Sequence, residues 1–162
     1  LLDGGAHFYG TYETKDGKHV SIGSIEPQFY ALLLEKTSLD KDPDLANQMS
    51  RDEWPKLREK LATVIATKTR DEWDVIMLGT DICYAPILNF AEAVEHPHNQ
   101  ARQTFVTSAD ITQAAPAPRF SRSEPELPQP PVAPGAHSDE VLASLGLDAA
   151  AIAELKESGA VA

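Results

Sequence analysis

The residue best placed to do chemistry in this sequence is an acid at the predicted start of a helix. A strand is predicted over 18–24, after the turn dipeptide Asp16-Gly17, and Pro27 suits a first helical turn because its φ is fixed and it has no N–H to leave unpaired. Glu26 therefore falls at the helix N-cap, where unpaired N–H groups and the positive helix end favour an ionised carboxylate. Such a carboxylate suits acid–base catalysis or the orientation of a catalytic group. An acid at a helix start is also an ordinary cap, and the spacing alone leaves both interpretations open.

The histidines give a weaker signal. His96-Pro97-His98 is the only histidine cluster, and no Cys, Asp or third His lies at ligand spacing. Surface or helix-end histidines are therefore predicted there in preference to a metal site. His7 and His19 lie beside or within a predicted hairpin and have no obvious partner.

The single cysteine is predicted to be buried and unreactive. Cys83 stands in an apolar run over 82–88, which is typical of a buried strand, and one cysteine excludes an internal disulfide framework and an all-cysteine zinc site. The sequence also has no nucleophile elbow, phosphate loop or dinucleotide fingerprint.

Composition indicates a globular and acidic protein. Of 162 residues, 42% are apolar and 24% charged, and 14 Lys and Arg against 25 Asp and Glu give a net charge of −11. Such a surface repels phosphate backbones and anionic membranes, so neither nucleic acid nor a membrane is expected as a partner. The start is no signal peptide and no apolar run has the length of a membrane span, so a cytoplasmic location is expected. The chain opens on Leu1 without an initiator Met, and we expect it to be entered in the middle of a longer one.

The elements predict an α+β fold with poorly self-sufficient flanks. A hairpin is expected over 8–24, helices over 27–37, 50–65 and 69–78, and a strand over 82–88, with Ser50 and Thr69 opening the last two helices through capping boxes. Because Pro55 would cost a hydrogen bond in a helix that starts at Ser50, a start one turn later stays open. Trp54 and Trp73 are predicted core anchors. Short helical turns should follow around Pro97, then β structure over 104–111, and finally two short helices over 138–145 and 148–157.

These elements divide the chain into four parts. We expect a linker over 1–10, a small α/β domain with a short antiparallel sheet over 11–88, and a return linker over 89–135. Seven of the twelve prolines lie in 116–134, which favours an extended arm there. The helices over 136–162 should pack on a domain that this sequence does not contain.

A series of motifs carries a resemblance to a known family. They are Leu2-Asp3-Gly4-Gly5, Phe8-Tyr9, Asp16-Gly17-Lys18, Glu26-Pro27-Gln28-Phe29, Arg70-Asp71-Glu72-Trp73, Cys83-Tyr84-Ala85-Pro86, His96-Pro97-His98-Asn99 and Pro116-Ala117-Pro118-Arg119. Over nearly its whole length the chain resembles the second half of the racemases of the family III CoA-transferase (CaiB/BaiF) superfamily. The run Glu26 to Phe29 marks that racemase branch.

The resemblance implies a two-domain enzyme that forms an interlocked homodimer. Each active site then lies between one subunit's large domain and the other subunit's small domain. The large domain, with most of the CoA site and the family's catalytic His and Asp, is absent from this sequence. The implied substrate is an acyl-CoA thioester of fatty acid or lipid metabolism, and no metal or redox cofactor is implied, since coenzyme A enters only as part of the substrate.

The implied reaction is an isomerisation: inversion of the α-carbon of 2-methylacyl-CoA thioesters by removal of a proton and its return to the opposite face. Glu26 matches the family glutamate that hydrogen-bonds the catalytic histidine. Leu2, Tyr9 and Ile25 are expected to line the acyl pocket, although a plain core role for Ile25 stays open. Two departures from the family pattern, His7 in place of Pro and Gly10 in place of Asp, affect the linker near the site.

Two other functions stay open. One is a CoA-transferase of the same superfamily with an aspartyl nucleophile in the missing half. The other is a fragment that serves only in dimerisation or packing. On either account, and on the racemase account, the isolated chain is expected to be catalytically inactive.

Overall fold

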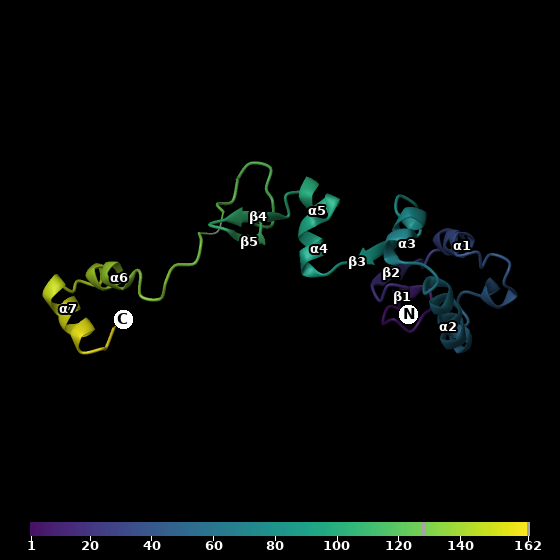
Figure 1. Cartoon of the computed structure of the whole chain (residues 1–162), viewed down its shortest axis with the longest axis horizontal. Helices are drawn as coiled ribbons and strands as arrows, with labels where there is room; N and C mark the ends of the chain where they lie inside the picture. The colour runs from purple at the N-terminus through teal and green to yellow at the C-terminus, as the bar shows by residue number, and fades with distance from the viewer. Residues whose placement is uncertain (128, 162) are drawn as a thin grey trace. The chain divides into compact units, whose positions relative to one another are not determined.

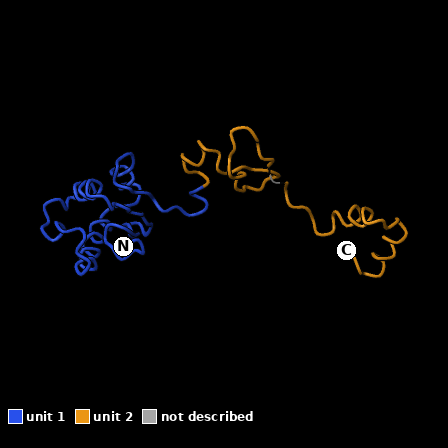
Figure 2. The backbone as a smooth tube through the Cα atoms, turned by 180° about the vertical axis from the view of Figure 1, so that it is seen from behind, with its two compact units in different colours: residues 1–93 blue, residues 94–162 orange. Residues whose placement is uncertain are grey.

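The chain folds as helices and short antiparallel strands, as the sequence predicts (Figure 1). The computed structural model describes residues 1–127 and 129–161. These form two compact units, 1–93 and 94–162, coloured separately in Figure 2. No helix within the described residues is long and apolar enough to cross a membrane.

The first unit is built on a three-stranded antiparallel sheet in the order β1-β2-β3. Strand β1 is Tyr9–Glu13, β2 is His19–Gly23 and β3 is Tyr84–Ile87. β1 and β2 form the predicted hairpin, whose turn is closed by the N–H of Thr14, 2.9 Å from the carbonyl of Lys18. Proline 86 lies in the edge strand β3, where a missing N–H costs least.

Helices fill the long connection between β2 and β3 (Figure 1). In chain order they are α1 Pro27–Lys36, the 3-10 turns η1 Pro43–Ala46 and η2 Arg51–Glu53, α2 Trp54–Ile65 and α3 Arg70–Met77. The capping box predicted at Ser50 is wrong, because Ser50 makes no side-chain cap and only a 3-10 turn follows it. The α-helix starts at Trp54, which places Pro55 in the first turn, where its missing N–H is tolerated.

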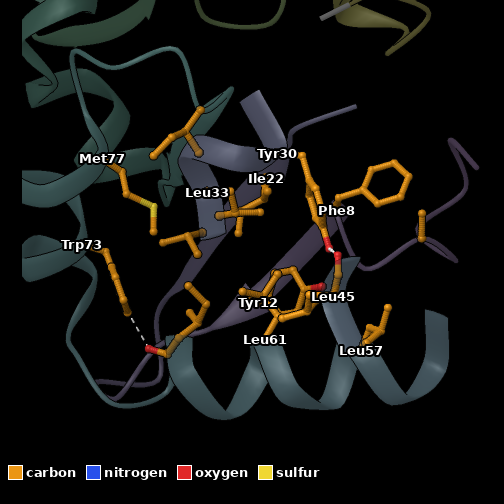
Figure 3. Packing of buried hydrophobic residues seen from close by; sticks show 14 of the residues in the cluster. Phe8, Tyr12, Ile22, Tyr30, Leu33, Leu45, Leu57, Leu61, Trp73 and Met77 are labelled. Carbon is orange, nitrogen blue, oxygen red and sulfur yellow. Dashed lines mark hydrogen bonds between the residues drawn. The ribbon is translucent and has the colours of Figure 1, made fainter. Parts of the chain in front are cut away.

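The core lies between the sheet and α2 (Figure 3). One stripe of α2 is buried at helical spacing, namely Trp54, Leu57, Leu61 and Ile65. Opposite it lie alternate residues of the hairpin and the inner side of α1, including Tyr12, Val20, Ile22, Tyr30 and Leu33. The indole N–H of Trp73 donates to the carbonyl of Ile65 at 2.7 Å, a bond drawn in Figure 3. Both tryptophans are core anchors, as predicted.

The start of the chain takes part in this core. Ala6, His7 and Phe8 are fully buried, although the sequence predicts a linker over 1–10. Phe8 packs edge-on against Trp54, with ring centroids 5.8 Å apart. The glycine-rich composition of 1–10 favours a linker and gives no sign that side chains within it are buried.

The first unit also extends past the predicted boundary at residue 88. Helix α4, Phe90–Glu95, carries Glu92, whose carboxylate forms two hydrogen bonds of 2.8 and 2.9 Å with the largely buried guanidinium of Arg70. Lys18 lies 3.0 Å from the same carboxylate. These charge-assisted bonds fasten α4 to α3 and to the hairpin turn.

Helix α3 begins with the predicted capping box. The hydroxyl of Thr69 accepts from the N–H of Glu72, whose carboxylate accepts in turn from the N–H of Thr69.

Thr69→Ala should therefore lower the free energy of unfolding by about 1 kcal/mol in urea titrations of the 162-residue chain. Thr63→Ala, on the exposed face of α2, should change it by less than about 0.5 kcal/mol. Equal effects of the two substitutions would contradict a stabilising role for the cap.

The second unit contains short elements joined by a proline-rich arm. They are α5 Pro97–Ala101, the hairpin β4 Phe105–Ser108 and β5 Ile111–Ala114, then α6 Ser138–Ser144 and α7 Ala149–Glu157. In the described part of 116–134 there is no helix or strand. The last two helices are followed by Gly146 and Gly159 at positive φ, as their predicted ends require.

Candidate functional site

Glu26 occupies the predicted position at the N-cap of α1. Its backbone is extended, with φ −70° and ψ 142°, and its carbonyl accepts from the N–H groups of Phe29 and Tyr30 at 3.0 Å each. The carboxylate is exposed and makes no capping bond within the described residues. An anion at this end of a helix is stabilised by the helix dipole, and its free oxygens can accept a hydrogen bond from a donor in another chain segment.

The end of the sheet beside Glu26 is tightly joined. The N–H of Gly23 donates to the carbonyl of Cys83 at 2.9 Å, and the Ser24 hydroxyl donates to the carbonyl of Ile82 at 2.5 Å. The ring of Tyr9 and the backbone of Cys83 would each lie 3.7 Å from a Cβ atom added at Gly23. Tyr9 and Cys83 therefore lie on either side of Gly23, at the end of the strand that leads into Glu26.

Cys83 is exposed, so the prediction of a buried thiol is wrong. The strand starts two residues later than the apolar run suggests, and Cys83 adopts the left-handed backbone conformation, φ 60°, which turns it out of the ladder. Ile82 takes the buried position instead. Desolvation raises the pKa of the Cys83 thiol, and the negative charge of Glu26 raises it further, so the thiol stays protonated at neutral pH and is a poor nucleophile.

The three predicted pocket residues are placed differently. Tyr9 is half-buried and its ring lies against Gly23, and Ile25 is half-buried against the core directly before Glu26. Leu2 is 64% exposed, so this chain leaves most of its side chain uncovered. Only Tyr9 and Ile25 are thus joined to the site by contacts within the described chain.

His7 has a partner that the sequence did not reveal. Its ring is fully buried, and its Nε2 lies 2.8 Å from the hydroxyl of Tyr30, which in turn donates to the carbonyl of Leu45 at 3.2 Å. Because the tyrosine has one proton to donate, this arrangement favours the tautomer in which Nε2 of His7 carries the hydrogen. Burial lowers the pKa of His7 to about 4, so the ring is neutral at neutral pH.

Gly10 makes room for an arginine that crosses the first strand. The guanidinium of Arg58 donates to the carbonyls of Gly4 and Thr11 at 3.0 Å each and lies 4.9 Å from the ring centre of Tyr12. A Cβ atom at Gly10 would lie 2.7 Å from Nη1 of Arg58. The departure at Gly10 therefore affects how the segment that carries Leu2 is held.

A further side chain reaches the site from a loop to which the sequence assigned no role. The amide nitrogen of Gln48 donates to the carbonyls of Ser24 and Ile25 at 3.0 and 2.9 Å. The stretch 40–48 is polar and carries a proline, so its composition predicts only a loop or a broken helix. A contact across 24 positions leaves no local pattern by which it could be found.

The only histidine cluster behaves as helix-end histidines. The Nδ1 atom of His96 accepts from the N–H of His98 at the start of α5, at 3.3 Å. Among the described residues no group of three or more His, Cys, Asp or Glu side chains is arranged to hold a metal ion.

Comparison with known proteins decides the family. The family model described as CoA-transferase family III matches residues 2–138. The chain belongs to CoA-transferase family III. It is 44% identical over 158 residues to the alpha-methylacyl-CoA racemases of Mus musculus and Homo sapiens, an alignment that covers 96% of the chain and 41% of each relative. The chain thus spans less than half the length of these curated family III relatives.

Solved structures support the same fold. A CAIB/BAIF family protein from Brucella suis aligns with a TM-score of 0.69 at 19% identity, over 89% of this chain and 39% of that one. Rv3272 from Mycobacterium tuberculosis aligns with a TM-score of 0.66 at 19% identity, over 83% of this chain and 38% of that one. The α+β fold predicted from the resemblance is therefore confirmed as that of family III.

Proposed function

We propose that this chain is the C-terminal part of a racemase that inverts the α-carbon of 2-methylacyl-CoA thioesters. The observation that carries the proposal is the exposed, uncapped carboxylate of Glu26 at the tip of α1, in a chain 44% identical to proteins named alpha-methylacyl-CoA racemase. The complete enzyme acts as a homodimer in the cytoplasm, in fatty acid metabolism, and the large domain that holds most of the CoA site precedes these residues.

The chemistry needs an acid–base group on each face of the α-carbon. The α-proton of a thioester is acidic because sulfur conjugates poorly with the carbonyl, and an enolate stabilised by hydrogen-bond donors is the intermediate. Glu26 accepts a hydrogen bond from the imidazole of a histidine in the large domain. A negative carboxylate beside the ring raises the pKa of the imidazole, which makes it a better base. Neither metal nor redox cofactor takes part in this sequence of proton transfers.

The side chains beside Glu26 fit an apolar substrate. Tyr9 and Ile25 present half-buried apolar surface at the same end of the sheet, and Leu2 adds a largely exposed apolar side chain. In this proposal they contact the acyl chain, which swings between two orientations while the α-carbon stays nearly fixed. The raised pKa of the Cys83 thiol gives it no part as a nucleophile.

Exchange of the α-hydrogen with solvent separates the possible activities. The full-length polypeptide that carries these residues should exchange the α-proton of a 2-methylacyl-CoA for deuterium in D₂O without any acyl acceptor, as followed by mass spectrometry. The 162-residue chain alone should show no exchange, because in this proposal the catalytic histidine and aspartate belong to the large domain. Turnover that requires an acyl acceptor would indicate a CoA-transferase instead. Failure of the full-length polypeptide to bind acyl-CoA at all would indicate a packing module.

A further inference from the structure

The backbone directly before Glu26 is hydrogen-bonded by one side chain that is distant in the sequence. Gln48 approaches the carbonyl oxygens of Ser24 and Ile25, the two residues directly before Glu26. Since both partners are acceptors, only the amide nitrogen of Gln48 can face them, which fixes the orientation of its amide. Its two N–H groups are therefore both used on consecutive peptide units.

The loop that carries Gln48 is itself fixed to the core. The indole N–H of Trp54 donates to the carbonyl of Gln48 at 2.9 Å, and Trp54 is buried, with 7% of the residue exposed. Trp54 also packs edge-on against Phe8, whose carbonyl accepts from the N–H of Ser24 at 3.0 Å. Two connections from the core, one through Gln48 and one through Phe8, thus meet on Ser24.

Glu26 is in consequence held on both sides of its Cα atom. On its C-terminal side the carbonyl of Glu26 is fixed by the first hydrogen bonds of α1, and on its N-terminal side the peptide units are fixed by Gln48. The carboxylate itself makes no capping bond within the described residues. The position and orientation of the carboxylate therefore depend on the hydrogen bonds that fix the backbone on either side of Glu26.

We propose that Gln48 is the positioning residue for Glu26. The proposal rests on the proposed function, because it assigns Gln48 a part in the reaction only through the carboxylate that Gln48 places. A displacement of about 1 Å at a reacting group can cost on the order of 100-fold in rate. Loss of the two hydrogen bonds from Gln48 should thus lower turnover without removing any group that contacts substrate.

The test is Gln48→Glu in the full-length polypeptide, assayed by α-hydrogen exchange. The substitution keeps the shape of the side chain but points carboxylate oxygen at two carbonyl oxygens. We expect kcat to fall by about 10- to 100-fold and KM to change by less than about threefold. Asn47→Asp is the matched control: it makes the same chemical change on the neighbouring exposed residue, and it should leave both constants unchanged.

A double-substitution cycle separates positioning from a general structural role. If Gln48 acts through Glu26, adding Gln48→Glu to Glu26→Gln should lower the rate no further. The carboxylate that Gln48 positions is already absent in Glu26→Gln, so its displacement has no additional effect on the rate. An equal additional loss in that background would overturn the proposal. Should Gln48→Glu fail to fold, Gln48→Met, which lacks both donors without adding charge, takes its place in the same cycle.

The two proposals fail in different ways. If the full-length parent protein shows no α-hydrogen exchange without an acyl acceptor, the proposed function is wrong. If it does exchange but Glu26→Gln leaves the rate unchanged, Glu26 lies outside the mechanism and the positioning role of Gln48 is wrong with it. If Glu26→Gln abolishes exchange but Gln48→Glu and Gln48→Met both match the parent protein in kcat, only the positioning role of Gln48 is wrong.

Discussion

Replacing Glu26 with Gln in the full-length polypeptide should lower kcat for α-hydrogen exchange by about 100- to 10,000-fold, the usual contribution of a positioned acid–base group. KM should change little, because the carboxylate acts on the catalytic imidazole and not on the acyl-CoA. The amide keeps the size of the side chain but removes the negative charge that raises the basicity of the imidazole. The measurement is deuterium incorporation under saturating substrate.

Glu35→Gln is the control for this prediction. Glu35 lies on the same helix, is exposed, and contacts only Lys36 among the described ion pairs. Its substitution removes the same charge 9 positions away and should leave kcat unchanged. A Glu26 variant as fast as the Glu35 variant would exclude Glu26 from the mechanism.

Acidification should destabilise the chain through His7 well before the carboxylates titrate. The pKa of His7 is lowered to about 4 by burial, from 6.5 in an unfolded chain. Above pH 6.5 the ring is neutral in both states and its contribution to stability is complete. As the pH falls from 6.5 to 4, the unfolded chain binds a proton that the folded chain excludes, so stability falls by on the order of 3 kcal/mol.

The measurement is urea unfolding of the 162-residue chain at a series of pH values between 7 and 4.5. His7→Leu should flatten the dependence in this window, whatever it does to the absolute stability. His19→Leu, the same change at an exposed position of β2, should preserve the slope. Asp44 and Glu92, whose pKa values Lys60 and Arg70 lower in the folded chain, lose their contribution to stability mainly as the pH falls below their ordinary values of 3.8 and 4.5, and they do so equally in the parent and in both variants. An unchanged slope in the His7 variant would contradict the burial of a neutral ring.

Local signals explain why the hairpin and the helix that carries Glu26 were predictable. The Asp16-Gly17 turn and Pro27 each act within a few residues, and the Thr69 capping box closes over three. At Ser50 the same local signal failed, because Pro55 has no N–H for the next turn of an α-helix that starts so early. A local sequence signal therefore predicts an element reliably only where no nearby residue, such as a proline, favours a different start or end.

The rest of the site depends on contacts that no local pattern reports. Ser24 bonds to Ile82 across 58 positions, His7 to Tyr30 across 23 and Gln48 to Ser24 across 24. The exposure of Cys83 is also set by distant residues. The pairing of β3 with β2 begins at Tyr84 opposite Ile22, and Cys83 joins β2 through the hydrogen bond from the N–H of Gly23 to its carbonyl. A carboxylate and its helix can be found from sequence, whereas the side chains that aim it come from the tertiary structure.

The most direct test of the central claim is a crystal structure of the full-length protein with a 2-methylacyl-CoA bound. We predict a hydrogen bond of about 2.7–3.2 Å between a carboxylate oxygen of Glu26 and one nitrogen of an imidazole whose other nitrogen faces the α-carbon of the substrate. A Glu26 side chain that points to solvent, with no imidazole within about 6 Å, would contradict the account, because at that distance neither a hydrogen bond nor a strong effect on the imidazole pKa remains.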